Sequence, residues 1–138
     1  MKRLSFIIVS VALIASLFTA TSCLATQGSA FLDAGAADLT ATGTQFVQYW
    51  LFRFDTATAG RTLTTPSAAD IIKALQSPSV GIVIVLGVTA DGANPVIIQG
   101  GNGVTVKPSA VTIAANTTLT IYCTLDNVSS GSEAITIY

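Results

Sequence analysis

The chain has 138 residues, of which 51% are hydrophobic and only 9% are charged, and this length fits a single domain. Six basic residues stand against seven acidic ones, without the clustered lysines and arginines that bind nucleic-acid phosphates. Histidine is absent, which removes the commonest general base and transition-metal ligand. We therefore expect no nucleic-acid partner, no metal and no cofactor.

Residues 1–25 are typical of an export or membrane-anchoring segment. Lys2 and Arg3 precede an uncharged, strongly apolar run over Leu4–Ala25, which predicts a hydrophobic helix and indicates a secretory signal peptide. The run is also long enough to span a bilayer, so a retained membrane anchor is a second interpretation. A third is a lipoprotein, because Cys23 ends a sequence that resembles a bacterial lipobox and is a candidate lipidation site.

Residues 26–43 are rich in Ala, Gly, Thr and Ser without a clean period, which predicts a flexible arm or linker before a domain at 44–138. Gln45–Phe54 is dense in aromatic residues and predicts a strand that is apolar on both faces. We interpret these aromatics mainly as core. Tyr49 and Trp50 are the candidate contact surface, for sugars among other ligands, if they are exposed.

One short helix is expected in the middle of the chain. Arg61–Thr65 predicts a short strand, after which Ser67 is a good helix N-cap and Pro78 a good stop. Val80–Val88 is apolar except at its glycines. This predicts a central strand that is buried on both faces, between a second sheet and the helix.

Thr117–Leu125 alternates strictly between apolar and polar residues, and Val104–Ala115 and Glu133–Tyr138 follow the same pattern. Strands are predicted in Pro95–Gln99, Val104–Ala115, Thr117–Leu125 and Glu133–Tyr138. Cys123 falls on the inward parity of its strand, which predicts a buried and inert thiol. The fold class that we expect is therefore all-β: an antiparallel, jelly-roll-like β-sandwich with one short helix.

Two sequons and the acidic residues are the remaining candidates for chemistry. Asn116 and Asn127 begin N-glycosylation sequons on predicted turns. Acidic residues fall on predicted turns and strand ends, where carboxylates normally face water: Asp55, Asp91, Asp126 and Glu133. No serine has a histidine partner. We therefore expect no enzymatic activity.

The segment Arg61–Tyr138 contains, in order, RTLTTPSAADIIKAL, SPSVG, GGNGVTVKPSAVTIAANTTLTIYCTLDNV and SSGSEAITIY. This series resembles a β-sandwich module of virion structural proteins, found in tailed-phage head-decoration and fibre proteins and in relatives from large algal viruses. The resemblance implies a module that assembles or decorates without catalysis, and it carries over no active-site residues. The hydrophobic leader departs from phage head proteins and points to a virus with an internal membrane or to a cellular surface protein.

The function predicted from these features is that of a non-enzymatic structural or assembly protein, such as a virion-type minor capsid or decoration subunit. Its expected partners are copies of itself or other structural subunits, and a membrane through the N-terminal segment. Its expected location is membrane-associated or extracellular, on a virion or a cell surface. The alternative is a secreted bacterial surface or filament protein, or a carbohydrate-binding adhesion module.

Overall fold

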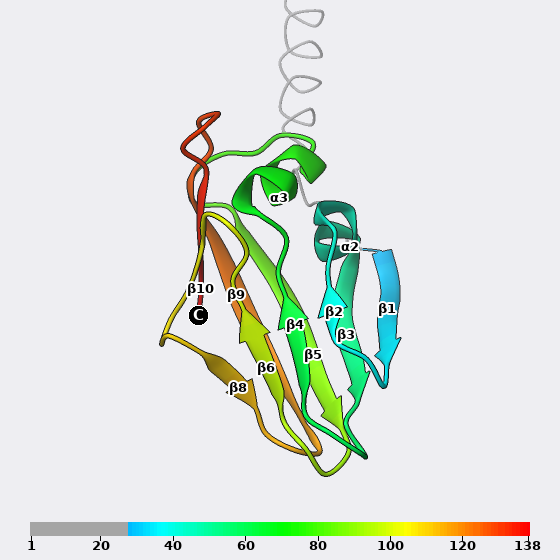
Figure 1. Cartoon of the computed structure of the whole chain (residues 1–138). Coiled ribbons are helices and arrows are strands. Elements are labelled where there is room, and N and C mark those ends of the chain that lie inside the picture. The colour runs from blue at the N-terminus through cyan, green and yellow to red at the C-terminus, as the bar shows by residue number, and fades with distance from the viewer. Residues whose placement is uncertain (1–27) are drawn as a thin grey trace, which may run out of the picture.

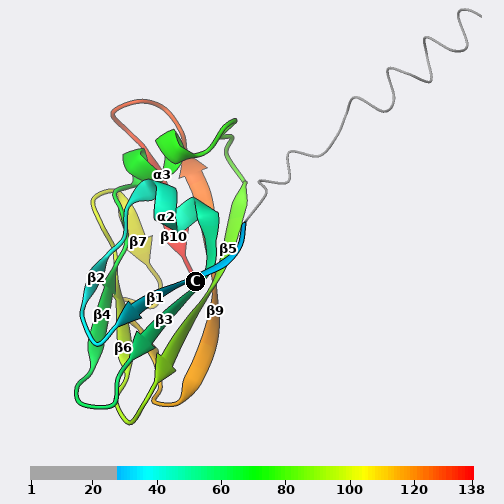
Figure 2. The same cartoon turned by 90° about the vertical axis from the view of Figure 1, so that its right-hand side faces the viewer.

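The computed structural model describes residues 28–138, in which two β-sheets face each other and two short helices lie together at one end of the sandwich (Figures 1 and 2). The predictions for residues 1–25, including Cys23, lie outside the described residues. The elements in chain order are β1 (Gly28–Gly35), β2 (Leu39–Thr40), α2 (Gly43–Gln48), β3 (Tyr49–Asp55), β4 (Arg61–Thr64), α3 (Ala68–Ala74), β5 (Val83–Asp91), β6 (Val96–Gln99), β7 (Val104–Val106), β8 (Val111–Ile113), β9 (Thr117–Asn127) and β10 (Ala134–Ile137).

The chain alternates between the two sheets strand by strand from β1 to β9. One sheet has the order β1-β3-β5-β9-β10-β7 and the other the order β2-β4-β6-β8. From β1 to β6, strands that are neighbours in one sheet are therefore connected through a strand of the opposite sheet, and they run in the same direction. Four of the eight strand pairings in the described residues are parallel for this reason, and a fifth parallel pairing joins β10 to β7.

The broad prediction of an all-β sandwich agrees with this architecture, but the prediction of antiparallel, jelly-roll-like sheets does not. Jelly rolls are antiparallel, whereas β1, β3 and β5 form a parallel block that meets an antiparallel partner only at β9. Alternation of apolar and polar residues reports which face of a strand is buried. It carries no information on the direction of the neighbouring strand, so the antiparallel arrangement could not be predicted from it.

The stretch predicted to be a flexible arm contributes a strand to each sheet. β1 pairs in parallel with β3, with Leu32 opposite Phe52, and β2 pairs with β4. The side chain of Asp38 fixes the second pairing, since its Oδ1 accepts a hydrogen bond from Thr62 N at 2.8 Å. Both strands lie at sheet edges, and Leu32, Ala34 and Leu39 pack against the core from them.

The aromatic run predicted as one strand is divided between a helix and a strand. α2 ends at Gln48, and β3 begins only at Tyr49. A capping box starts the helix: Gln45 N donates to Thr42 Oγ1 at 3.2 Å, and Thr42 N donates to Gln45 Oε1 at 2.9 Å. The described residues therefore contain two helices where one was predicted.

The predictions for β4 and α3 are confirmed. Ser67 is the N-cap of α3, and its Oγ accepts a hydrogen bond from Asp70 N at 3.1 Å. Ile71 and Ile72 are buried on the inner side of the helix. The same Ser67 hydroxyl lies 2.6 Å from Asp70 Oδ2, so this carboxylate belongs to the helix cap.

The strand β5 is central, as predicted, but only one of its faces is buried. It lies between β3 and β9, and Ile84, Leu86 and Val88 point into the core while Val83 and Val85 are exposed. The prediction assumed that the helix covers the outer face. Instead α2 and α3 lie at the end of the sandwich (Figure 2), which leaves the outer face of the six-stranded sheet uncovered by any element of the described residues.

The core fills the space between the sheets. Its largest fully buried side chains are Phe46, Phe52, Phe54, Leu63, Ile71, Leu86, Ile98, Ile113, Ile121, Leu125, Ile135 and Ile137. Phe46 from α2 lies against Phe52 from β3, with 6.2 Å between ring centroids. The helix α2 therefore covers the core at one end of the sandwich. Cys123 is fully buried among these residues, which confirms its predicted inward position.

Burial raises the pKa of the Cys123 thiol from 9.0 to about 12, and this predicts a pH-dependent loss of stability. The unfolded chain releases the proton above pH 9 while the folded chain retains it, so folding becomes less favourable from pH 9 to pH 12. We expect a contribution of about 1.4 kcal/mol per pH unit in that window, absent from Cys123→Ala. Urea unfolding of both proteins at pH 8 and pH 10 measures it; identical pH dependences would contradict a buried neutral thiol.

Candidate interaction surface

Exposed apolar side chains cross the outer face of the six-stranded sheet. We call this set the apolar band; it consists of the exposed Phe31, Val85, Tyr122 and Tyr138 together with the half-buried Leu51. The exposed fractions are 55% for Phe31, 50% for Tyr122 and 55% for Tyr138. Large aromatic side chains left in water on one face are a common sign of an interaction site.

The strand register brings the members of the apolar band together. Phe31 is opposite Leu51, and Val85 is opposite Tyr122. Tyr122 and Tyr138 exchange two backbone hydrogen bonds, of 3.2 and 2.9 Å, so their side chains lie next to each other on the same face. Beyond them, Lys107 Nζ lies 5.8 Å from the centroid of the Tyr138 ring, which places a cation at this end of the band.

Gly87 has no side chain, so the middle of this face is flat at β5. The Cβ atom that any other residue would carry there lies only 2.8 Å from Leu51 Cδ1. Leu51 therefore extends from β3 over the backbone of β5, in the space that a side chain at position 87 would occupy. Leu51 thus adds apolar surface over β5, which lies between β3 and β9 in the sheet.

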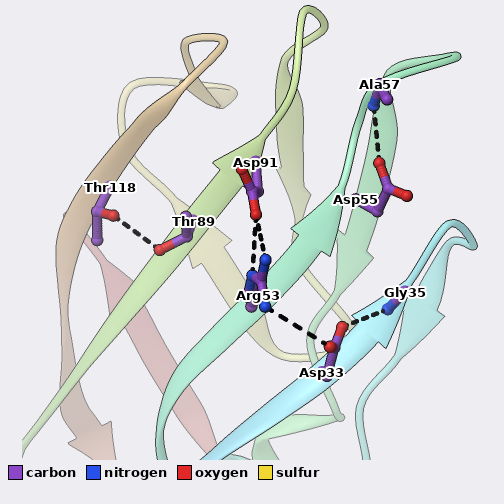
Figure 3. Close-up of polar contacts among 8 residues, drawn as sticks. All are labelled: Asp33, Gly35, Arg53, Asp55, Ala57, Thr89, Asp91 and Thr118. Atoms are coloured by element: carbon purple, nitrogen blue, oxygen red, sulfur yellow. Dashed lines mark hydrogen bonds and ion pairs between the residues drawn. The ribbon is translucent and has the colours of Figure 1, made fainter.

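A charged cluster borders the apolar band toward the carboxyl ends of β3 and β5 (Figure 3). Arg53 Nε donates to Asp91 Oδ2 at 3.1 Å, its Nη2 contacts the same oxygen, and Nη1 lies 4.0 Å from Asp33 Oδ2. The hydrogen bond from Arg53 to Asp91, followed by the charge of Asp91, raises the pKa of the guanidinium. These side chains are about half exposed, so water screens the pairs, and they contribute little to stability.

The carboxylates of this cluster also stabilise turns. Asp33 Oδ1 accepts from Gly35 N and Asp55 Oδ1 accepts from Ala57 N, each at 2.9 Å, which is the bonding of Asx-turns. Among residues 28–138, no group of three or more His, Cys, Asp or Glu side chains is arranged to hold a metal ion. The cluster therefore forms a polar border to the face, and its parts are accounted for by turns and ion pairs.

The structure does not bring the predicted contact residues Tyr49 and Trp50 into one platform. They are consecutive in β3, and consecutive strand residues point to opposite faces. Tyr49 is half-buried on the outer face, while Trp50 is 46% exposed on the parity of the buried Phe52 and Phe54. The exposed aromatics that do share a face come from other strands. Tyr122 was detectable in the sequence, since it is the one aromatic residue on the wet parity of Thr117–Leu125.

Both sequons were predicted on turns; Asn116 lies in one, whereas Asn127 is the last residue of β9. Asn116 is exposed in the turn between β8 and β9, with a φ of 55°, and Asn127 ends β9, where its Oδ1 accepts from Ser129 N at 2.9 Å. In the first sequon, Thr118 Oγ1 lies 2.7 Å from Thr89 Oγ1 (Figure 3). Glycosylation stays a prediction, as does lipidation of Cys23.

Comparisons with known proteins give no match: no family model, no curated protein and no solved structure matches the chain. Within the part of the chain that the structure describes, neither helix has the length and apolar character needed to cross a bilayer.

Proposed function

We propose that this chain is a non-enzymatic structural subunit that assembles through the outer face of its six-stranded sheet. The observation that carries the proposal is the apolar band, in which Phe31, Tyr122 and Tyr138 are each at least half exposed on one face. Burying such a surface against a partner is favourable by roughly 25 cal/mol per Å² of apolar area. The band offers contact area, and its polar groups are the two tyrosine hydroxyls.

The kind of assembly is that of a virion-type minor capsid or decoration subunit that is exported or delivered to a membrane. The order of motifs in Arg61–Tyr138 supports the virion-type role, and the apolar run at Leu4–Ala25 supports delivery to a membrane. The partners are copies of this chain or other structural subunits. The low charge content of the chain fits a subunit whose surface is partly covered by neighbouring subunits, because the cores of interfaces are depleted of charged residues.

A secreted carbohydrate-binding module is the second candidate. The neighbouring rings of Tyr122 and Tyr138, both exposed and with Lys107 beside them, favour it, because aromatic faces provide rigid contact area with a polar edge. Binding to a glycan array that is lost in Tyr138→Ala, with the fold retained, would support this candidate over assembly.

The assembly proposal predicts that a charge in the apolar band dissociates the assembled form. In Tyr122→Asp, the new carboxylate would be buried without a partner in any contact through this face, so we expect at least a tenfold weaker association. Sedimentation velocity of the full chain over a range of concentrations, with negative-stain microscopy, measures this. The matched control is Ile97→Asp, since Ile97 is 44% exposed on the outer face of the other sheet.

Thermal unfolding of both variants checks that each is folded. Assembly that survives Tyr122→Asp but is lost in Ile97→Asp would place the contact on the four-stranded sheet and contradict the proposed surface. A wild-type chain that stays monomeric at all concentrations and joins no particle in its native source would contradict the structural function itself.

A further inference from the structure

The four edges of the two sheets differ in length. β2 has two residues, and β7 and β8 have three each, whereas β1 has eight. Natural proteins keep edge strands short, because an edge presents backbone N–H and C=O groups that can pair with another strand. β1 is the end strand of the six-stranded sheet and lies at its margin (Figure 1). It is therefore the longest of the four edges, and its regular stretch is Phe31–Asp33, since the register with β3 shifts between Gly28 and Phe31 and between Asp33 and Gly35.

We propose that β1 pairs antiparallel with β1 of a second copy of this chain, which joins two six-stranded sheets edge to edge across a two-fold axis. This inference rests on the proposed function, self-assembly, and specifies one contact through which it occurs. A two-fold contact uses the same surface on both copies, so it requires an edge that is complementary to itself.

The apolar band fixes the register of this pairing. A two-fold axis perpendicular to the sheet keeps the outer faces of both copies on the same side, so residues opposite each other share a parity and the axis passes through one residue. An axis at Phe31 places the two Phe31 rings together and joins the two apolar bands into one. An axis at Leu32 would instead place Phe31 opposite Asp33 of the second copy, an aromatic ring against a carboxylate.

Charge favours the antiparallel direction. With the axis at Phe31, the two Asp33 residues are four positions apart, about 13 Å in a regular strand. This exceeds the screening length of about 8 Å at physiological ionic strength. A parallel, in-register pairing would stack Asp33 on Asp33 at about 4.8 Å. The antiparallel arrangement also moves the charged clusters around Arg53 to opposite ends of the joined sheet.

Disulfide trapping tests the register. In the full chain with Cys23→Ser, so that the buried Cys123 is the only native thiol left, we compare Phe31→Cys with Asp33→Cys under mild oxidation. Both positions are exposed on the outer face of the same strand. We expect a disulfide-linked dimer from Phe31→Cys, formed at least tenfold faster than from Asp33→Cys, because only residue 31 meets its own copy.

Amide hydrogen exchange of the unmodified chain tests the pairing without altering the band. We expect exchange of β1 amides to slow at least tenfold on assembly, while the short edge β8 serves as the internal control. Assembly with unchanged β1 exchange would overturn the inference and leave the proposed function standing. Absence of assembly would overturn both. A third outcome is that β1 is protected but Phe31→Cys forms crosslinks only to a different structural protein. This would overturn the assignment of a second copy as the partner.

Discussion

Replacing Phe52 with alanine is expected to lower the free energy of unfolding by about 3–5 kcal/mol, the range for a large aromatic side chain deleted from a packed core. Phe52 is fully buried between the sheets. Its ring lies against that of Phe46, with 6.2 Å between centroids, and Leu32 of β1 is opposite it in the sheet. The truncation removes contacts to a helix and to the edge strand together. Urea unfolding with linear extrapolation measures the change.

Phe31→Ala is the matched control for this prediction. The substitution is chemically the same and lies on the adjacent strand, but Phe31 is 55% exposed on the outer face. We expect a change in stability of about 0.5 kcal/mol or less, together with weaker assembly if the apolar band is the contact surface. Equal losses of stability in the two variants would mean that Phe31 is packed within a single copy, and would remove it from the interaction surface.

Sequence patterns were sufficient to predict those elements whose formation depends on interactions between residues close in the chain. The Ser67 cap, the apolar residues after it and the alternation in Thr117–Leu125 each follow from interactions within a few residues, and α3 and β9 formed as predicted. The start of the aromatic run was misassigned because its β-propensity was given more weight than the Thr42 and Gln45 capping box. That box is a short-range signal, and it was present in the sequence.

Long-range arrangement was not predictable from the same patterns. Phe31, Val85, Tyr122 and Tyr138 lie in separate segments of the chain, and Val85 stands in a run that is apolar on both faces, so its sequence neighbours do not mark it as exposed. Only the sheet order brings them into one band. That order depends on a chain path that alternates between sheets, which periodicity does not record. Tyr49 and Trp50 were chosen because they are adjacent in sequence, and adjacency in a strand separates side chains.

Gly92→Ala is expected to destabilise the fold by about 3 kcal/mol or more, because it combines an unfavourable backbone conformation with overpacking. Gly92 has a φ of 149°. A Cβ atom there would lie 2.4 Å from Ala57 N and 2.5 Å from the carbonyl carbon of Thr56. These neighbours are backbone atoms, so the clash is relieved only if the loop after β3 moves away from the turn after β5.

That movement would break a set of loop contacts at the end of the sandwich away from the helices. Thr56 N donates to Asp91 O at 3.1 Å, and Asn94 donates to Thr56 O through its backbone N at 3.2 Å and its Nδ2 at 2.8 Å. Asn116 N donates to Gly92 O at 3.0 Å, which ties in the turn before β9. The contacts connect three loops, so their loss is expected to be cooperative.

Gly81→Ala separates the two contributions to this effect. Gly81 also has a positive φ, of 88°, but a Cβ atom there would meet nothing within 4 Å. We expect Gly81→Ala to lower the free energy of unfolding by about 1–2 kcal/mol, which is the cost of the left-handed backbone conformation alone. Unfolding both variants in urea gives the difference, and equal losses would show that the Thr56–Ala57 backbone moves freely. Because Gly92 lies in a turn outside the apolar band, the fraction of Gly92→Ala that remains folded should still assemble, which separates the stability of this fold from its use as a contact surface.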